Sequence, residues 1–346
     1  MMKSKKEALE IAKLYNRWIE ESRLVKSPRT VDSYEQTINL YIRFLTSEKG
    51  INIKSFKIKD CFSRSTIEDW LRWLQSNNKC TPQSCNVRLS NLHSFMKYLS
   101  IDDYKYTELY ISSMSVERRK TIKVKIRGIS EDGIDALLKS IDVSNDVGLR
   151  DCILWQMVYL TGMRISEALS IRLKHLNLKT KKPSVTIVGK RDKIRTPYLP
   201  AVLASNLNGY IRRIFGKHYD DDSYLFFSRV KGKLHPMTVK GAEERLKKNA
   251  AEAHKICKDV PLDLHPHMLR HSFATHRLDD GMNIIQLSEI LGHEDISTTM
   301  RYLDISEKQT TEAVRHLEDE KARSIKKKWT SNTSVELKQL FAKAKI

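Results

Sequence analysis

The sequence lacks the long apolar run that a membrane span requires. No stretch approaches the ~18 consecutive apolar residues of a transmembrane helix, and the first residues carry charge without the apolar segment of a secretory signal. The five cysteines are odd in number and scattered, which is typical of reduced thiols in a cytoplasm rather than of a disulfide framework. Cys80 and Cys85 have no second pair to complete a four-ligand set, so no zinc site is expected.

Positive charge, in contrast, is in large excess. The chain has 62 Lys and Arg against 42 Asp and Glu, a net charge of +20. Such an excess favours a polyanionic partner through the release of bound counterions. An anionic membrane would require a concentrated basic amphipathic helix, whereas these charges are spread over the whole chain. The composition therefore indicates nucleic-acid binding, with no membrane partner, in a cytoplasmic and nucleoid-associated protein.

The length of 346 residues predicts two domains, because it exceeds what one core usually serves. Residues 1–100 have apolar positions at helical spacing and predict a small all-helical domain. Within it, Ser65 and Glu68 have the spacing of a capping box at a helix start. Residues 101–128 are basic and poorly periodic, which predicts an interdomain linker, either lying along a phosphate backbone or simply solvated.

A second domain is predicted over residues 129–305. It is mostly helical, but residues 184–200 contain two short β-rich runs around a charged turn, which predicts a hairpin. Residues 306–346 form a tail, and its last part, 331–346, carries an apolar stripe too short to fold alone. The expected fold class is mainly α with a small β-sheet in the second domain (α+β).

Several polar positions are candidates for chemistry. On a helix beginning near Pro266, His267 and Arg270 share one face with Ala274, and we expect this basic pair to project away from the core. A guanidinium there could hold a phosphate, although an ordinary exposed polar face would look the same. The helix region also holds four histidines, which point in different directions and have no carboxylate or cysteine to complete a metal set: His265, His267, His271 and His276.

Candidate residues also stand at three other places in the sequence. Arg164 follows a helix ended by Gly162, and Glu167 lies within reach of it across one turn. The pair could hold a phosphate at the start of the next helix, or it could be an ordinary surface ion pair. Lys190 stands in the hairpin turn, where Arg191 and Lys193 are equally placed candidates. Tyr302 lies roughly 110° from the centre of the apolar face of a short helix, so its ring could be clamped while its hydroxyl faces a cleft. A purely structural tyrosine would lie in much the same way.

The ordered set of motifs resembles the tyrosine recombinase family of phage integrases and Xer-type resolvases. The motifs are T-G-x-R-x-x-E at Arg164, H-x-x-R at His267, and L-G-H at His293 with Tyr302 nine residues later. The resemblance implies a clamp of two domains, a helical SAM-like core-binding domain and a catalytic domain. It further implies that Arg164 and Arg270 hold the scissile phosphate.

The remaining roles are also implied by the resemblance. His267 and His293 would be the two histidines of the site, Glu167 the acidic helper and Lys190 the general acid. Tyr302 would be the nucleophile that forms a 3′-phosphotyrosyl intermediate, with no metal, cofactor or ATP. No arm-binding domain precedes the core-binding helices, so accessory arm sites are not expected.

The partners implied are double-stranded DNA with an inverted-repeat core site and a synaptic tetramer of the chain on that DNA. Residues 331–346 could dock on a neighbouring protomer or on their own domain. The reaction would be integration, excision or resolution of a prokaryotic mobile element or replicon. The competing hypotheses are a non-catalytic DNA-binding protein and a DNA-relaxing enzyme like the type IB topoisomerases.

Overall fold

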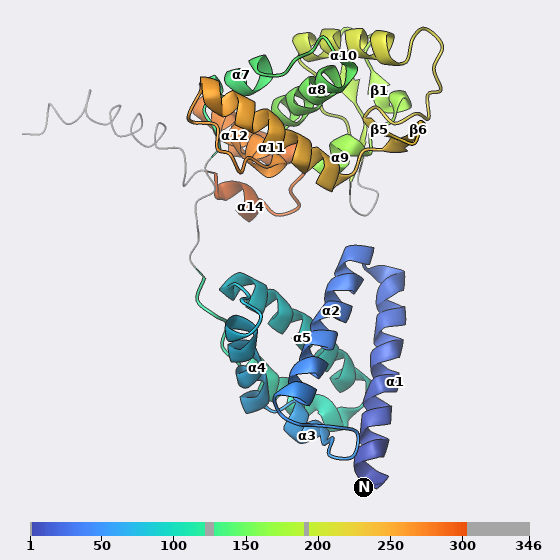
Figure 1. The fold of residues 1–346 in the computed structure, drawn as a ribbon, viewed down its shortest axis with the longest axis vertical. Coiled ribbons are helices and arrows are strands. Elements are labelled where there is room, and N and C mark those ends of the chain that lie inside the picture. The colour runs from blue at the N-terminus through green and yellow to red at the C-terminus, as the bar shows by residue number, and fades with distance from the viewer. Residues whose placement is uncertain (1, 122–127, 190–193, 303–346) are drawn as a thin grey trace, which may run out of the picture. The chain divides into compact units, whose positions relative to one another are not determined.

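The structure is a computed structural model that describes residues 2–121, 128–189 and 194–302. The chain divides into two compact units, Met1–Val124 and Lys125–Ile346, which are treated separately (Figure 1). Within the described residues, no helix is both long enough and apolar enough to cross a membrane.

The first unit is entirely helical in its described part. Its central helix, α5, packs against α1, α2, α4 and α6. The elements are α1 (Met2–Val25), α2 (Pro28–Ser47), α3 (Ile58–Cys61), α4 (Arg64–Ser76), α5 (Pro82–Asp102), the 3₁₀ turn η1 (Tyr104–Tyr106) and α6 (Thr107–Met114).

Aromatic side chains fill the core of this unit. Trp18 lies 5.1 Å from Phe95 between ring centroids, and Tyr41 meets Trp70 edge-on at 4.8 Å. All four side chains are buried. Pairs of this kind add roughly 0.5–1.5 kcal/mol beyond the area they bury, so the small domain has a substantial core of its own.

Two local predictions in this unit are wrong. Helix α4 is capped by Ser63, whose hydroxyl accepts from the backbone N–H of Thr66, and not by Ser65. The predicted linker begins too early, because residues 104–114 are helical and packed on α5. Tyr106 anchors them, since its ring is buried and its hydroxyl donates to Glu10 at 2.8 Å.

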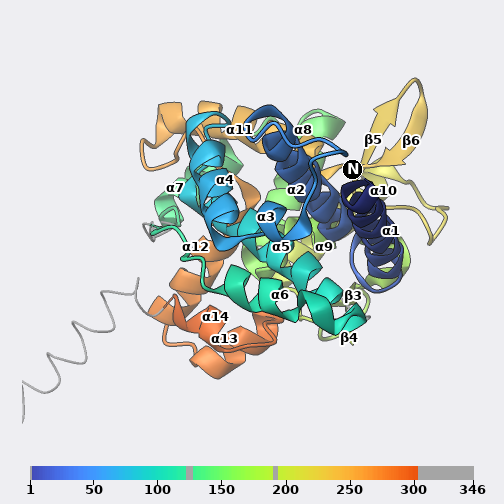
Figure 2. The same cartoon turned by 90° about the horizontal axis from the view of Figure 1, so that it is seen from below.

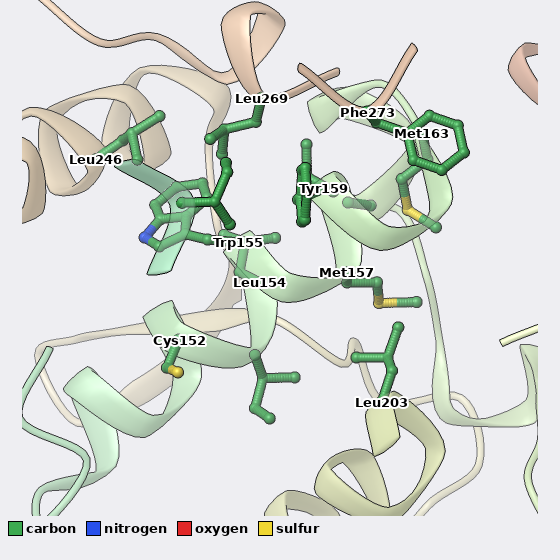
Figure 3. Packing of buried hydrophobic residues seen from close by; sticks show 14 of the residues in the cluster. Cys152, Leu154, Trp155, Met157, Tyr159, Met163, Leu203, Leu246, Leu269 and Phe273 are labelled. Carbon is green, nitrogen blue, oxygen red and sulfur yellow. The ribbon is translucent and has the colours of Figure 1, made fainter. Parts of the chain in front are cut away.

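The second unit surrounds one buried helix, α8. Its residues Leu154, Trp155 and Met157 are inaccessible to solvent and pack among side chains of neighbouring helices such as Leu246 and Leu269 (Figure 3). The helices are α7 (Glu131–Lys139), α8 (Asp146–Thr161), α9 (Ile165–Leu169), η2 (Leu173–His175), α10 (Ala201–Ile214), α11 (Val239–Ile256), α12 (Pro266–Asp279), α13 (Ile284–Leu291) and α14 (Ser297–Met300).

Helix contacts in this unit bring its later helices to the end of α8. α8 packs against α9, α10 and α12, α12 packs against α13, and α13 packs against α14. Figure 2 shows α13 and α14 side by side. The C-terminal end of α8 and the helices that follow α12 therefore meet in one region.

Three short antiparallel ladders complete the part of the second unit that the structure describes. They pair β1 (Leu176–Asn177) with β2 (Ser184–Val185), β3 (Ile187–Val188) with β4 (Ile194–Arg195), and β5 (Phe227–Val230) with β6 (Lys233–Pro236). The β3–β4 pair is the hairpin predicted within 184–200, with Ile187 opposite Arg195. The predicted fold class, mainly α with small β elements in two units, is confirmed.

Candidate active site

Arg164 begins a helix directly after a tight turn. Helix α8 ends at Gly162, whose φ of 63° is the left-handed conformation that glycine adopts most easily. A Cβ at Gly162 would also lie 2.5 Å from Cδ1 of Phe273. The turn presents Arg164 at the N-cap of α9, where the positive helix end disfavours a cation unless an anion lies near.

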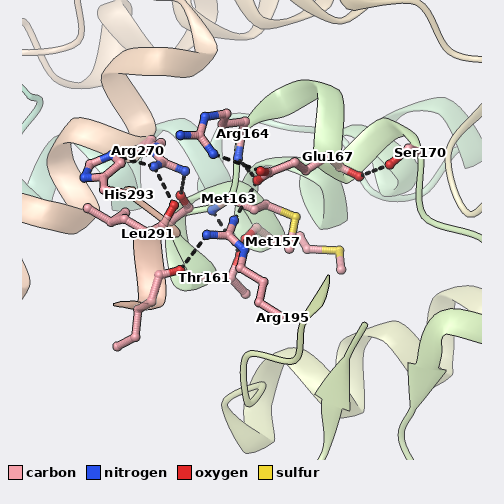
Figure 4. A network of polar contacts seen from close by, with 12 residues as sticks. Met157, Thr161, Met163, Arg164, Glu167, Ser170, Arg195, Arg270, Leu291 and His293 are labelled. Atoms are coloured by element: carbon pink, nitrogen blue, oxygen red, sulfur yellow. Dashed lines mark hydrogen bonds and ion pairs between the residues drawn. The ribbon is translucent and has the colours of Figure 1, made fainter. Parts of the chain in front are cut away.

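Glu167 supplies one such anion. Its Oε1 accepts from the Arg164 guanidinium at 3.0 Å, and its Oε2 accepts from the Arg164 backbone N–H at 2.8 Å (Figure 4). The predicted contact across one turn is therefore confirmed. Glu167 is buried, but 46% of the Arg164 side chain stays exposed, so this guanidinium can still contact a ligand.

Arg270 lies in the interior, which corrects the expectation that it projects away from the core. Its residue is 1% exposed, and Ala274 on the same helix face is fully buried. Its guanidinium donates to the carbonyl oxygens of Gly162 at 2.7 Å and Leu291 at 2.8 Å. Burial lowers the pKa of Arg270 to about 10, and the charge of Arg164 adds to this effect. Around Arg270 this face of α12 is covered by the turn at Gly162 and by the end of α13, whereas His267 stays exposed as predicted.

His293 is held between Arg270 and Thr299. The Arg270 guanidinium donates to Nε2 at 2.9 Å, so Nε2 is the acceptor, and Nδ1 carries the proton that it shares with the Thr299 hydroxyl at 2.7 Å. Burial, with the charge of Arg270, lowers the pKa of His293 to about 4. The imidazole is therefore neutral near pH 7 and orients Arg270.

His267 is the second predicted histidine, and it stands on α12 one turn before His271. The two rings lie 4.5 Å apart and meet edge-on. Burial lowers the pKa of His267, and the charge of Arg270 acts in the same direction. The imidazole of His267, which stays exposed at the start of α12, is therefore neutral near pH 7.

Tyr302 is buried at the same place, with 3% of its surface exposed. Its ring meets His271 at 5.0 Å and lies parallel to His293 at 6.5 Å. Burial raises the pKa of its hydroxyl, while the charge of Arg270 acts to lower it. The ring is clamped as predicted, although Tyr302 follows the four-residue helix α14 rather than lying on a longer one.

Arg195 is a residue that sequence reasoning missed. Its guanidinium donates to Oε2 of Glu167 at 2.7 Å (Figure 4). It also donates to the carbonyl oxygen of Ile290 at 2.8 Å. A signal existed, because Arg195 stands opposite Ile187 in the hairpin, and directly opposed side chains share a face of the sheet. Ile187 is buried, so an arginine faces the interior there.

The other predicted positions are Lys190 and the histidines around α12. Lys190, with its alternatives Arg191 and Lys193, lies outside the described residues. Among the four histidines of α12 and its N-cap, His267 and His271 are in ring contact, whereas His276 turns to the hydroxyl of Tyr159. In the described part of the chain, no three His, Cys, Asp or Glu side chains are grouped to hold a metal ion.

Two regions of the chain match described protein families. Residues 127–309 match the phage integrase family, and residues 15–101 match the phage integrase N-terminal SAM-like domain. Among curated proteins, the chain is 27% identical over 283 residues to tyrosine recombinase XerC of Staphylococcus epidermidis, covering 82% of this chain and 88% of that one. It is 29% identical over 292 residues to a tyrosine recombinase of Pseudothermotoga lettingae, covering 84% and 92%.

Solved structures show the same fold. XerH recombinase bound to a palindromic difH substrate aligns with a TM-score of 0.66 at 20% identity, over 88% of this chain and 84% of that one. The Tn1549 transposon integrase in complex with transposon right-end DNA also gives 0.66, at 18% identity, over 88% and 99%. At these identities the likeness concerns the fold alone.

Proposed function

We propose a covalent mechanism for this chain, which belongs to the phage integrase family of tyrosine recombinases, enzymes that cut and rejoin DNA at specific sites. In this mechanism Tyr302 attacks the scissile phosphorus of duplex DNA. The bond between its Oη and phosphorus forms, and the bond from phosphorus to the 5′-oxygen breaks. The products are a 3′-phosphotyrosyl link and a free 5′-hydroxyl, so the phosphodiester energy is retained and rejoining needs no ATP.

One observation carries the proposal: the described residues give the buried Arg270 guanidinium no carboxylate contact, and it bonds to His293, whose ring lies parallel to that of Tyr302. In the described residues, Arg270 contacts two carbonyl oxygens and a neutral imidazole, and its Nε–H has no partner. A desolvated cation of this kind is stabilised by a bound anion. A phosphate beside Tyr302 fits that requirement, because a guanidinium fork matches its oxygens.

The neighbouring groups take their roles from this arrangement. Arg164, whose side chain is partly exposed, holds the same phosphate from the start of α9 and neutralises charge that builds in the transition state. His267 is neutral and accepts the phenolic proton as general base. His293 orients Arg270, and Glu167 orients Arg164. Lys190 is proposed as the general acid that protonates the 5′-oxygen.

The proposed partner is duplex DNA with an inverted-repeat core site. The net charge of +20 supports it, and XerH and the Tn1549 integrase were solved in complex with DNA. We further propose that the first helical unit, through α6, forms the core-binding domain, with 129–305 as the catalytic domain and 306–346 as a tail. Four chains would assemble on two sites, with residues 331–346 docking in trans. If deletion of 331–346 leaves synaptic tetramers intact, trans docking is wrong.

The proposed setting is a prokaryotic mobile element or replicon, with the enzyme in the cytoplasm at the nucleoid. A strand-exchange assay separates this function from the alternatives. Sites are first recovered by binding selection from random duplexes, and plasmids with one or two sites are then incubated with the protein and EDTA. Recombinant products from the two-site plasmid are expected. Relaxation without exchange would indicate a topoisomerase, and binding without either would indicate a non-catalytic DNA-binding protein.

A further inference from the structure

Arg195 connects three segments that are distant in sequence. It stands on β4, donates to Glu167 at the start of α9 and donates to the carbonyl oxygen of Ile290 in the last turn of α13. Its side chain is only 16% exposed. Burial lowers its pKa, and the negative charge of Glu167 opposes that effect. Burying the Arg195 cation costs solvation free energy, and both terminal nitrogens of its guanidinium are held by acceptors. Such a guanidinium is suited to hold its neighbours in place.

The end of α13 shows what this arginine holds. The last carbonyl groups of a helix have no partner within the helix. Here the carbonyl of Ile290 accepts from Arg195, and the next one, Leu291, accepts from Arg270. Two guanidiniums thus cap adjacent carbonyls, at a helix end where positive charge is favourable. Arg195 is thereby anchored next to the turn that leads to His293.

The other end of the fork holds the carboxylate that orients Arg164. Oε2 of Glu167 accepts from both Arg195 and the backbone N–H of Arg164, and Oε1 accepts from the Arg164 guanidinium. Gly292 leaves room for this arrangement, because a Cβ there would lie 2.3 Å from Nη1 of Arg195. The Glu167 carboxylate is therefore held by Arg195 and by the backbone N–H of Arg164 while it accepts from the Arg164 guanidinium.

We infer that Arg195 is a positioning residue of the phosphate site: anchored on Ile290, it holds Glu167 so that the Arg164 guanidinium points at the scissile phosphate. This inference rests on the proposed function. Arg195 touches no DNA atom in this account and acts only through Glu167. The inference predicts a loss in the rate of cleavage at saturating DNA, with little change in the affinity for DNA.

A double-variant cycle on single-turnover formation of the Tyr302–DNA adduct tests the inference. Arg195→Met is expected to slow adduct formation ~10–100-fold, as loss of a partner that orients a ligand-holding group typically does, with the Kd for DNA unchanged within ~3-fold. Arg164→Lys alone is expected to slow it ~10²–10³-fold. In the Arg164→Lys background, Arg195→Met is then expected to cost ~3-fold or less, because the group it positions is already lost.

Two further variants keep the outcome interpretable. Arg195→Lys retains the charge but reaches only one of the two acceptors, so an intermediate rate is expected. Arg245→Met removes an arginine that pairs with the buried carboxylate of Asp151 at 2.6 Å, outside the site, and is expected to lower stability without slowing adduct formation below its melting temperature.

The results separate the inference from the function on which it rests. Equal losses from Arg195→Met in the wild-type and Arg164→Lys backgrounds would overturn the inference, as would a rate no slower than that of Arg245→Met. If the wild-type protein forms no adduct on a site that it binds, the proposed function itself fails.

Discussion

Replacing Arg270 with lysine tests whether the buried guanidinium acts in the reaction. Lysine keeps the charge, but its ammonium group cannot reproduce a fork that reaches Gly162, Leu291 and His293 together. If it satisfies one of the three acceptors, two charge-assisted hydrogen bonds are lost at roughly 1.5–3 kcal/mol each. We expect the free energy of unfolding to fall by about 3–6 kcal/mol and adduct formation to slow by ~10²–10³-fold.

The measurement is single-turnover adduct formation at saturating DNA, well below the melting temperature of the variant. Arg150→Lys is the matched control. The side chain of Arg150 is 11% exposed, and it bonds to a backbone carbonyl, at Phe227, and to a carboxylate, at Asp151. It lies roughly 18 Å along α8 from Gly162, so its loss should lower stability but change the rate by less than about 3-fold. Equal slowing by the two substitutions would refute the reasoning.

Three other predictions concern the same unit and the charge of the chain. Gly292→Ala should destabilise the protein and slow adduct formation, because the φ of Gly292 is 64° and the new Cβ would displace Arg195. Gly216 also has a positive φ, but open space surrounds it, so the control Gly216→Ala should lower stability without slowing adduct formation. Burial holds the pKa of His271 and of His293 at about 4, below the ordinary 6.5. As the pH drops from 6.5 to 4, these histidines take up protons in the unfolded chain but not in the folded protein, so the urea midpoint of unfolding should fall. This fall in the midpoint should be smaller in His293→Asn. The affinity for duplex DNA, measured between 50 and 200 mM salt, should fall by ~10³–10⁵-fold if six to ten phosphates are contacted, and an unchanged affinity would contradict charge-driven binding.

Local relationships in this chain were predictable, because spacing alone determines them. Arg164 and Glu167 are three residues apart around a helix start, and their contact follows from helical geometry. The β3–β4 hairpin follows from alternation around a charged turn. The cap was harder to predict, since Ser63 and Ser65 are both suitable capping residues, and the structure places Ser63 before α4 and Ser65 inside it.

Long-range burial could not be read from a helical wheel. Arg270 stands on a polar face of α12 in sequence, but it is buried because a turn 108 residues earlier and a helix end 21 residues later accept its hydrogen bonds. In the sequence, Arg195 is one of several basic residues in a charged hairpin. Its partner Ile290 lies 95 residues away, and only folding brings the two together. Family motifs predicted the reacting groups, whereas the groups that hold them depend on tertiary packing.

Covalent trapping tests the central claim most directly. A nicked suicide duplex carrying a selected site is incubated with the protein in EDTA without ATP, and an SDS-resistant adduct is sought beside the same experiment with Tyr302→Phe. We predict an adduct in the wild-type protein that maps to the peptide containing Tyr302, and none in the variant. An adduct that persists in Tyr302→Phe, or no adduct on a site that the wild-type protein binds, would contradict the account.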